Sequence, residues 1–207
     1  MTVIAGPGAE VLNVSRETYE RLQDFAEILI KWNPKINLIS RASLPDLWTR
    51  HIADSMQVFD VAPKAQHWVD IGTGGGFPGI VAAILAAETS PDTRFTLIES
   101  DQRKSAFLRN AVRLCNLNAT ILAERIESVA PQGADVISAR ALSDLTTLLG
   151  YGERHASADC TMIFPKGKSW GKEVDDARTA WNFELETARS KTEPEAVLLI
   201  IKGVSRD

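Results

Sequence analysis

Five glycines stand within eight residues of this sequence, directly after a short apolar segment. The stretch reads Asp70-Ile71-Gly72-Thr73-Gly74-Gly75-Gly76-Phe77-Pro78-Gly79, and an apolar segment follows it up to Ala87. Glycine tolerates positive φ and lets bare backbone approach a ligand. Proline suits the first turn of a helix, where its missing N–H is not needed. A strand, a glycine loop and a helix in this order predict a ligand site at the carboxyl edge of a parallel sheet.

The segments around this loop alternate between strand and helix patterns. Strands are expected at 68–71, 94–99, 119–122, 134–138 and 160–164, with helices at 77–87, 102–115, 142–155 and 169–181. Two final strands, 183–188 and 196–201, have no helix between them, so we expect an antiparallel hairpin. The predicted fold class is α/β: a Rossmann-like, mostly parallel sheet of seven strands with helices on both faces.

The N-terminal third carries helical periodicity and no strand pattern. A first helix is expected from the N-cap Ser15 to Pro34, and a second from Ser43 to Pro63. The chain is therefore expected to have two parts, a small helical extension and a ligand-binding domain. Their expected bounds are 1–66 and 67–207, with a flexible tail over 1–12.

Composition excludes several classes of protein. A chain of 207 residues with 44% apolar and 24% charged side chains matches a folded globular domain and not a disordered one. Its apolar runs are shorter than the ~20 residues that cross a membrane, and its start does not resemble a signal peptide. Cys115 and Cys160 form neither a disulfide framework nor a zinc motif. We expect a cytoplasmic protein that uses no membrane and no metal.

Two kinds of ligand fit the glycine loop. Gly74 to Gly79 matches the G-x-G-x-x-G pattern of dinucleotide-binding loops. Glu99, suited to ribose hydroxyls, lies 27 residues after Gly72, against about 20 in those proteins. Asp70 stands two residues before the first glycine, an order typical of enzymes that use S-adenosylmethionine, whose sulfonium is a cation. The pattern favours S-adenosylmethionine and leaves a nicotinamide oxidoreductase as an alternative.

Several further motifs, in order along the chain, resemble one family. They are the loop 70–79, Trp32-Asn33 with Asn37-Leu38, Arg50-His51-Ile52-Ala53-Asp54-Ser55, Leu97-Ile98-Glu99-Ser100, Arg125-Ile126-Glu127, Ser138-Ala139-Arg140-Ala141 and Lys166-Gly167. Over about residues 28–168 the chain resembles the glucose-inhibited division protein B family of 16S ribosomal RNA guanine-N7 methyltransferases.

The resemblance implies a class I S-adenosylmethionine-dependent methyltransferase that acts on a guanine in the 530-loop region of 16S ribosomal RNA. It implies cofactor contacts from Gly72, Phe77, Ile126, Glu127 and Arg140. The loop and the matched strand ends add Asp70, Thr73, Gly74, Gly76, Glu99, Ser100 and Arg125. The expected partner is the small ribosomal subunit or its precursor, bound by a monomer.

Candidates for positioning the RNA are Asn33, Asn37, His51, Arg140 and Lys166. For several of these residues a role other than RNA contact is also open. Asn33 before a proline is a common turn residue. His51 could pair with a carboxylate on its own helix. Arg140 could hold the cofactor instead of the RNA.

The chemistry implied by the resemblance needs no general base. N7 of guanine is a lone pair without a proton, so in-line attack on the sulfonium methyl group requires mainly positioning, which is worth about 7–11 kcal/mol. The stretch after the fourth strand, 138–141, lacks the Asn/Asp-Pro-Pro-aromatic motif of amino-methylating enzymes. A methyltransferase for a small molecule or a protein remains an alternative, as does a non-catalytic RNA-binding module. The net charge of −4 excludes a generally basic surface, so an RNA footprint must be local.

Overall fold

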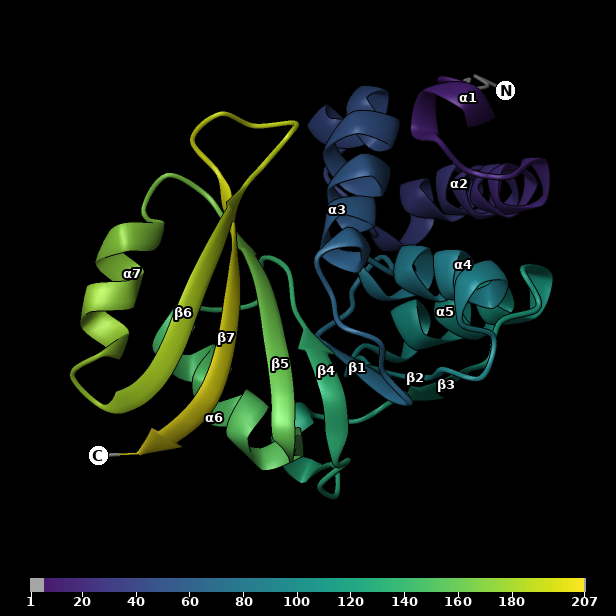
Figure 1. Ribbon diagram of the computed structural model, residues 1–207. Coiled ribbons are helices and arrows are strands. Elements are labelled where there is room, and N and C mark those ends of the chain that lie inside the picture. Colours follow the sequence, from purple (N-terminus) through teal and green to yellow (C-terminus); the bar gives the residue numbers. More distant parts are fainter. Residues whose placement is uncertain (1–5, 207) are drawn as a thin grey trace.

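A twisted sheet of seven strands runs through the centre of the computed structural model, which describes residues 6–206 (Figure 1). The strands are β1 His67–Ile71, β2 Arg94–Ile98, β3 Ala119–Leu122, β4 Ala134–Ser138, β5 Ala156–Lys166, β6 Trp181–Arg189 and β7 Val197–Arg206. Their order across the sheet is β3-β2-β1-β4-β5-β7-β6.

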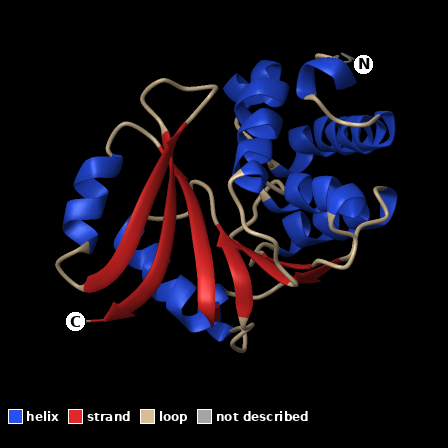
Figure 2. Cartoon of the chain, viewed as in Figure 1, coloured by secondary structure: helices blue, strands red, loops and turns tan. Residues whose placement is uncertain are grey.

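The pairing of the strands confirms the predicted fold class. The first five strands are parallel to one another, whereas β7 runs antiparallel to both of its neighbours, β5 and β6. The last two strands therefore form the expected hairpin, with β7 inserted next to the parallel strands (Figure 2). Every residue of β1 is buried, as expected for a central strand covered on both faces.

Helices cover both faces of the sheet and create two cores. On one face lie α2 Arg16–Ile36, α4 Gly79–Thr89 and α5 Gln102–Leu114, packed around a first hydrophobic cluster. On the other face, α6 Leu145–His155 and α7 Trp170–Ala177 pack around a second cluster. Side chains one residue before α2, α5 and α6 cap their free N–H groups: Ser15, Asp101 and Asp144.

The first long helix does not end where the sequence predicts. Pro34 was expected to stop it, yet α2 continues to Ile36. The proline removes one N–H donor, but the turn still closes because the N–H of Asn37 donates to the carbonyl of Asn33 at 3.0 Å. The expected flexible tail 1–12 falls partly on residues 1–5, which lie outside the described residues. Within the rest, Ala9–Leu12 forms one helical turn, α1.

The second helical segment begins earlier than predicted and is less regular. The 3-10 helix η1 Arg41–Asp46 leads into the π-helix η2 Leu47–Ala53 and then into α3 Asp54–Asp60. Its cap is Ser40 and not Ser43, because the Ser40 hydroxyl accepts the Ser43 N–H at 3.1 Å.

Two boundaries in the C-terminal half also differ from the prediction. Trp181, expected at the end of a helix, begins β6, where its buried ring lies beneath the guanidinium of Arg206. Helix α6 begins at Leu145, three residues late, because the Asp144 side chain caps it and leaves residues 139–143 as a loop. Within residues 6–206, none of the helices combines the length and apolar character needed to cross a membrane.

Candidate active site

A cleft of about 890 Å³ opens where the parallel strands end, between the glycine loop and the N-terminal helical segments. It brings together most of the residues selected from the sequence. Those that line it are Gly72, Thr73, Gly74, Phe77, Glu99, Ser100, Arg125, Ile126, Glu127, Arg140, His51 and Lys166. Four selected residues do not line it: Asp70, Gly76, Asn33 and Asn37.

The glycine loop keeps its backbone bare toward the cleft. Gly72 and Gly74 adopt φ of +64° and +57°, backbone angles that residues other than glycine rarely adopt. A Cβ atom on Gly72 would lie 2.6 Å from the side chain of Leu142. The loop is anchored by the Thr73 N–H, which donates to the carbonyl of Ile98 at 3.2 Å. This cradle fits a ligand that is held by close backbone approach.

Glu99 directly follows β2 and points its carboxylate at the same loop. Its Oε2 accepts the Gly74 N–H at 2.9 Å and its Oε1 accepts the Asp101 N–H at 2.8 Å, so the group is oriented before any ligand arrives. The residue is only 8% exposed, yet it lines the cleft. Each carboxylate oxygen has a second lone pair, so the pair can accept two hydroxyl protons of a ribose.

The predicted direct contact of Asp70 with the cofactor has no support in the geometry. Asp70 is fully buried beneath the loop, where Oδ1 accepts the Ser138 hydroxyl at 2.6 Å and Oδ2 accepts the Gly79 N–H at 3.1 Å. The Ser138 hydroxyl in turn accepts the Trp68 indole N–H at 2.8 Å. Burial raises the pKa of Asp70 to about 6, against the opposing effect of these hydrogen bonds. Asp70 therefore shapes the loop from below.

Asn33, Asn37 and Gly76 likewise support the walls of the cleft. The Asn33 side chain is buried, and its Oδ1 accepts the N–H of Ile39 at 2.9 Å, which closes the turn after α2. Asn37 is the left-handed C-cap of α2, with φ of +51°. Gly76 packs against Ile80 with φ of +92°. These residues therefore have structural roles in the turn after α2 and in the glycine loop, and none of the three lines the cleft.

His51 and Arg140 meet above the ring of Phe77. The Arg140 Nη2 lies 2.6 Å from His51 Nδ1, and its guanidinium carbon lies 5.0 Å from the centre of the Phe77 ring. Because the arginine donates to Nδ1, the proton of a neutral His51 stands on Nε2, which lies 3.0 Å from the Ser43 hydroxyl. Burial, followed by the charges of Arg140 and Arg50, lowers the pKa of His51 to about 4.

The titration of His51 is expected to appear in the pH dependence of stability. The unfolded histidine has a pKa of 6.5 and the folded one about 4, so between these values only the unfolded chain takes up the proton. The free energy of unfolding should therefore fall as the pH is lowered from about 6.5 to about 4. In His51→Gln this fall should be smaller, as measured by urea denaturation across that range. Asp70 contributes the opposite slope equally in both proteins, and curves of identical slope would contradict the prediction.

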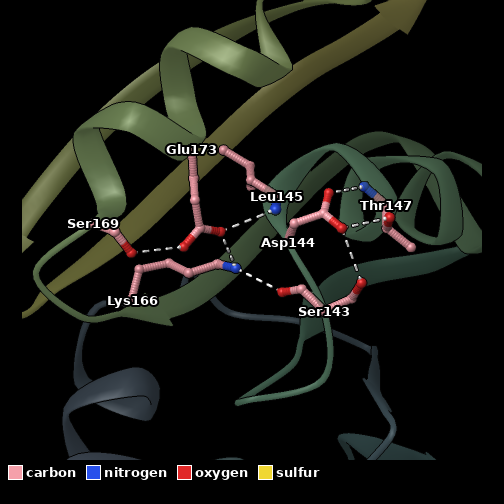
Figure 3. Close-up of polar contacts among 7 residues, drawn as sticks. All are labelled: Ser143, Asp144, Leu145, Thr147, Lys166, Ser169 and Glu173. Atoms are coloured by element: carbon pink, nitrogen blue, oxygen red, sulfur yellow. Dashed lines mark hydrogen bonds and ion pairs between the residues drawn. The ribbon is translucent and has the colours of Figure 1, made fainter.

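Lys166 does not offer a free ammonium group to RNA. Figure 3 shows its amino group between two partners, the Ser143 carbonyl at 2.8 Å and the Glu173 carboxylate at 2.7 Å. The Lys166 side chain is 10% exposed. Glu173 also accepts the N–H of Leu145, so the ion pair joins the end of β5 to the start of α6. Lys166 thus holds the loop that carries Arg140 and forms part of the cleft wall.

Replacing Lys166 by methionine is expected to lower the free energy of unfolding by about 1–3 kcal/mol, because the Glu173 carboxylate loses a largely buried charged partner. In a double-mutant cycle, Glu173→Gln should cost less in the Lys166→Met background than in the wild type. Lys168→Met is the matched control, since its ion pair with Glu195 is exposed and worth less than about 1 kcal/mol. Equal effects of the two lysine changes in urea denaturation would contradict the assignment.

The cleft also contains residues that the sequence did not mark as site residues, among them Asp54, Gln57 and Thr192. Asp54 was marked only by its place in the Arg-His motif, and nothing in the local pattern distinguished the other two. The loop between β6 and β7 reaches α3, where the Lys191 N–H donates to Gln57 Oε1 at 2.6 Å and the Thr192 hydroxyl donates to Asp54. This contact joins segments that lie more than a hundred residues apart.

The sheet order, the bare glycine loop and the acidic end of β2 define a class I methyltransferase dependent on S-adenosylmethionine. Solved structures share this fold, among them TYW2 of M. jannaschii in complex with AdoMet (TM-score 0.56, 12% identity, 78% of each chain). Another is a SAM-dependent methyltransferase of Aquifex aeolicus (TM-score 0.57, 14% identity, 86% of this chain and 97% of that one).

Two relatives place the chain more narrowly within this class. It is 61% identical over 201 residues to the ribosomal RNA small subunit methyltransferase G of Ruegeria sp. strain TM1040, covering 97% of this chain and 98% of the relative. With the protein of the same name from Ruegeria pomeroyi it shares 59% over 200 residues, with the same coverage. The family model described as rRNA small subunit methyltransferase G, GidB, matches residues 18–197, and the chain belongs to this family.

Proposed function

We propose that the chain transfers the methyl group of S-adenosylmethionine to N7 of a guanine in the 530-loop region of 16S ribosomal RNA. The observation that carries this proposal is the identity of about six residues in ten, over nearly the full length, with relatives named for small-subunit ribosomal RNA methylation. The cleft is consistent with it, since a cradle for the cofactor and a wall of polar side chains face one another.

The cofactor supplies an electrophilic methyl group on a sulfonium. Gly72, Gly74 and Phe77 would lie against its amino acid part, and Glu99 would accept hydrogen bonds from its ribose hydroxyls. Further cofactor contacts are proposed on the same side of the cleft, from Thr73, Ser100, Arg125, Ile126 and Glu127. The Ile126 side chain is buried at the cleft wall, and an apolar wall of this kind suits a purine ring.

The residues at the mouth of the cleft hold the base and need not move a proton. His51 is neutral at physiological pH because its pKa is about 4, and its Nδ1 is occupied by Arg140. Arg140 uses two of its five N–H donors on His51 and on the carbonyl of Arg50, at 2.6 and 2.9 Å. Its remaining donors can contact the base or a phosphate. This arrangement suits an acceptor atom that already carries a free lone pair.

The two walls of the cleft support a division of the chain into two parts. A helical extension, 1–66, would form the wall on the RNA side, and a methyltransferase domain, 67–207, would hold the cofactor. A monomer would suffice, because both walls come from one chain. The partner is the small ribosomal subunit or its precursor, met in the cytoplasm. Lys166 would act through the loop it holds.

The test uses small ribosomal subunits from a strain that lacks the gene. Purified protein and labelled S-adenosylmethionine are added, and the RNA is treated with borohydride and aniline, which cleave at N7-methylated guanine. New cleavage in the 530 loop is expected. Labelled RNA without cleavage there would overturn the assigned site. Label found only in protein or in a small metabolite would favour the alternative acceptor class.

A further inference from the structure

Asp54 is a carboxylate in the cleft for which the proposed methyl transfer has no use. It is the first residue of α3, lies three residues after His51 and lines the cleft. Burial raises its pKa, although the hydroxyl of Thr192 and the charges of Arg140 and Arg50 oppose the shift. A carboxylate repels the phosphates of RNA, so a role for Asp54 in binding the backbone is excluded. The Asp54 carboxylate therefore requires a partner that is a hydrogen-bond donor.

The two oxygens of Asp54 have different surroundings. Oδ1 accepts from the hydroxyl of Thr192 and from the amide of Gln57, the latter at 3.3 Å, which fixes the carboxylate in place. Within residues 6–206, Oδ2 has no hydrogen-bond donor, and Arg140 forms no ion pair with it. The two charges are nevertheless close enough to shift each other's pKa toward the charged form. A cation and an anion that influence each other's pKa therefore both line the cleft.

These groups follow a fixed order along the cleft wall. Phe77 belongs to the glycine loop, where the cofactor would lie. The guanidinium carbon of Arg140 stands 5.0 Å from its ring centre. Arg140 contacts His51, and Asp54 follows His51 by three residues on the helical segment. In this series of contacts, which runs from the glycine loop to α3, a donor, Arg140, comes before an acceptor, Asp54.

The edge of guanine has the complementary order. Beside N7 comes O6, an acceptor, and next comes N1–H, a donor. On the edge of adenine an amino group stands beside N7, and a bare lone pair stands at N1. When N7 of guanine is directed at the methyl group, O6 faces the N–H donors of Arg140 and N1–H faces the carboxylate of Asp54. Adenine would place its amino group against the N–H donors of Arg140 and its N1 lone pair against the Asp54 carboxylate. Each of these two repulsive contacts costs free energy.

We infer that Asp54 reads N1–H of the target guanine, while Arg140 donates to O6, so that the pair selects guanine over adenine. This inference rests on the proposed function, because it takes N7 of guanine as the methyl acceptor. Asp54 is a specificity-determining residue that touches the substrate. Gln57, from the same helix, and Thr192, from the loop between β6 and β7, position its carboxylate.

The experiment compares wild type with Asp54→Asn in single-turnover methylation, with mass spectrometry of the target nucleotide. Small subunits are reconstituted with guanine, inosine or adenine at the target. Wild type should methylate guanine and inosine, which shares O6 and N1–H, far faster than adenine. Asp54→Asn should methylate guanine about 10- to 100-fold more slowly, as for a lost charge-assisted hydrogen bond. Its preference for guanine over adenine should shrink, because an amide can donate to the adenine N1.

Two variants control for structural effects. Asp60→Asn changes a carboxylate on the same helix that is exposed and pairs with Lys191 at 3.5 Å, so it should keep the wild-type rate and base preference. Thr192→Ala loosens the carboxylate without removing it, so it should lower the rate while guanine remains preferred. The affinity of each folded variant for S-adenosylmethionine, measured by calorimetry, should match wild type.

The failure of this inference can be distinguished from failure of the proposed function. If wild type methylates no guanine N7 in the subunit, the proposed function fails first. If it does, and Asp54→Asn keeps the full preference for guanine over adenine, only the assignment of Asp54 is overturned. The inosine substrate tests recognition of O6 and N1–H without any variant, so this part of the inference stays testable if a variant unfolds. Inosine methylated as poorly as adenine would show that the exocyclic amino group is read in place of N1–H.

Discussion

Replacing Gly79 by alanine is expected to lower the free energy of unfolding by about 2–4 kcal/mol and to abolish cofactor binding at ordinary concentrations. A Cβ atom at this position would lie 2.3 Å from Leu97 Cδ2 and 2.7 Å from Asp70 Oδ2, closer than atoms can approach. The helix start must then move, which breaks the hydrogen bond from the Gly79 N–H to the buried Asp70 carboxylate. Urea denaturation measures the first effect, and calorimetry with S-adenosylmethionine measures the second.

Gly171→Ala is the matched control for this prediction. Gly171 lies in helix α7, and no atom lies within 4 Å of the position its Cβ would take. Alanine is a better helix former than glycine by about 1 kcal/mol, so this variant should be unchanged or slightly more stable. If Gly79→Ala unfolds at the same urea concentration as the control, the loop can accommodate a side chain and the steric explanation is wrong.

Replacing Glu99 by glutamine is expected to raise the Kd for S-adenosylmethionine about 10- to 100-fold, as for the loss of charge-assisted hydrogen bonds to the ribose hydroxyls. The carboxylate accepts two backbone N–H groups, from Gly74 and Asp101. An amide can accept only one of them, because its NH₂ group would face the other donor. The change therefore removes charge and disturbs the orientation of the side chain, and titration calorimetry measures the result.

A cofactor analogue without ribose hydroxyls separates these two effects. It should bind wild type and Glu99→Gln with nearly equal Kd if the carboxylate acts on the hydroxyls. A large difference with the analogue would show that the variant disturbs the loop instead. Glu186→Gln, exposed on strand β6, is the control for the change of charge and should leave the Kd unaltered. An unchanged Kd for Glu99→Gln with S-adenosylmethionine itself would contradict the assigned role.

Patterns local to the chain account for what could be predicted. The glycine loop follows a strand whose residues are all buried, and Glu99 directly follows β2, as their positions in the sequence indicated. Parallel strands end at one edge, so residues that follow them, such as Arg140, were expected to converge. The errors at Pro34 and Trp181 concern the ends of helices, where a single hydrogen bond or packing contact decides whether the helix continues.

The roles of individual polar side chains could not be predicted in this way. Lys166 lies at the carboxyl end of β5, as the sequence indicated, but its partner Glu173 stands on the next helix and neutralises it. Asp70 has the residue type and spacing of a ligand contact, but Ser138, from a neighbouring strand, holds it below the loop. Asn33 is used by the backbone of Ile39. Each outcome depends on which donor lies within about 3 Å, and spacing along the chain does not contain that information.

The sequence by itself determined the order of strands and helices and the glycine loop, because hydrophobic period, glycine and proline act over a few residues. The family was indicated by the motifs that resemble it. Only the tertiary structure decided which charges are free. It paired Lys166 with Glu173, buried Asp70, and brought Thr192 from the last hairpin against Asp54 of the N-terminal segment. The physical reason is that hydrogen bonds and charges act across space within a few ångströms, whatever the distance along the chain.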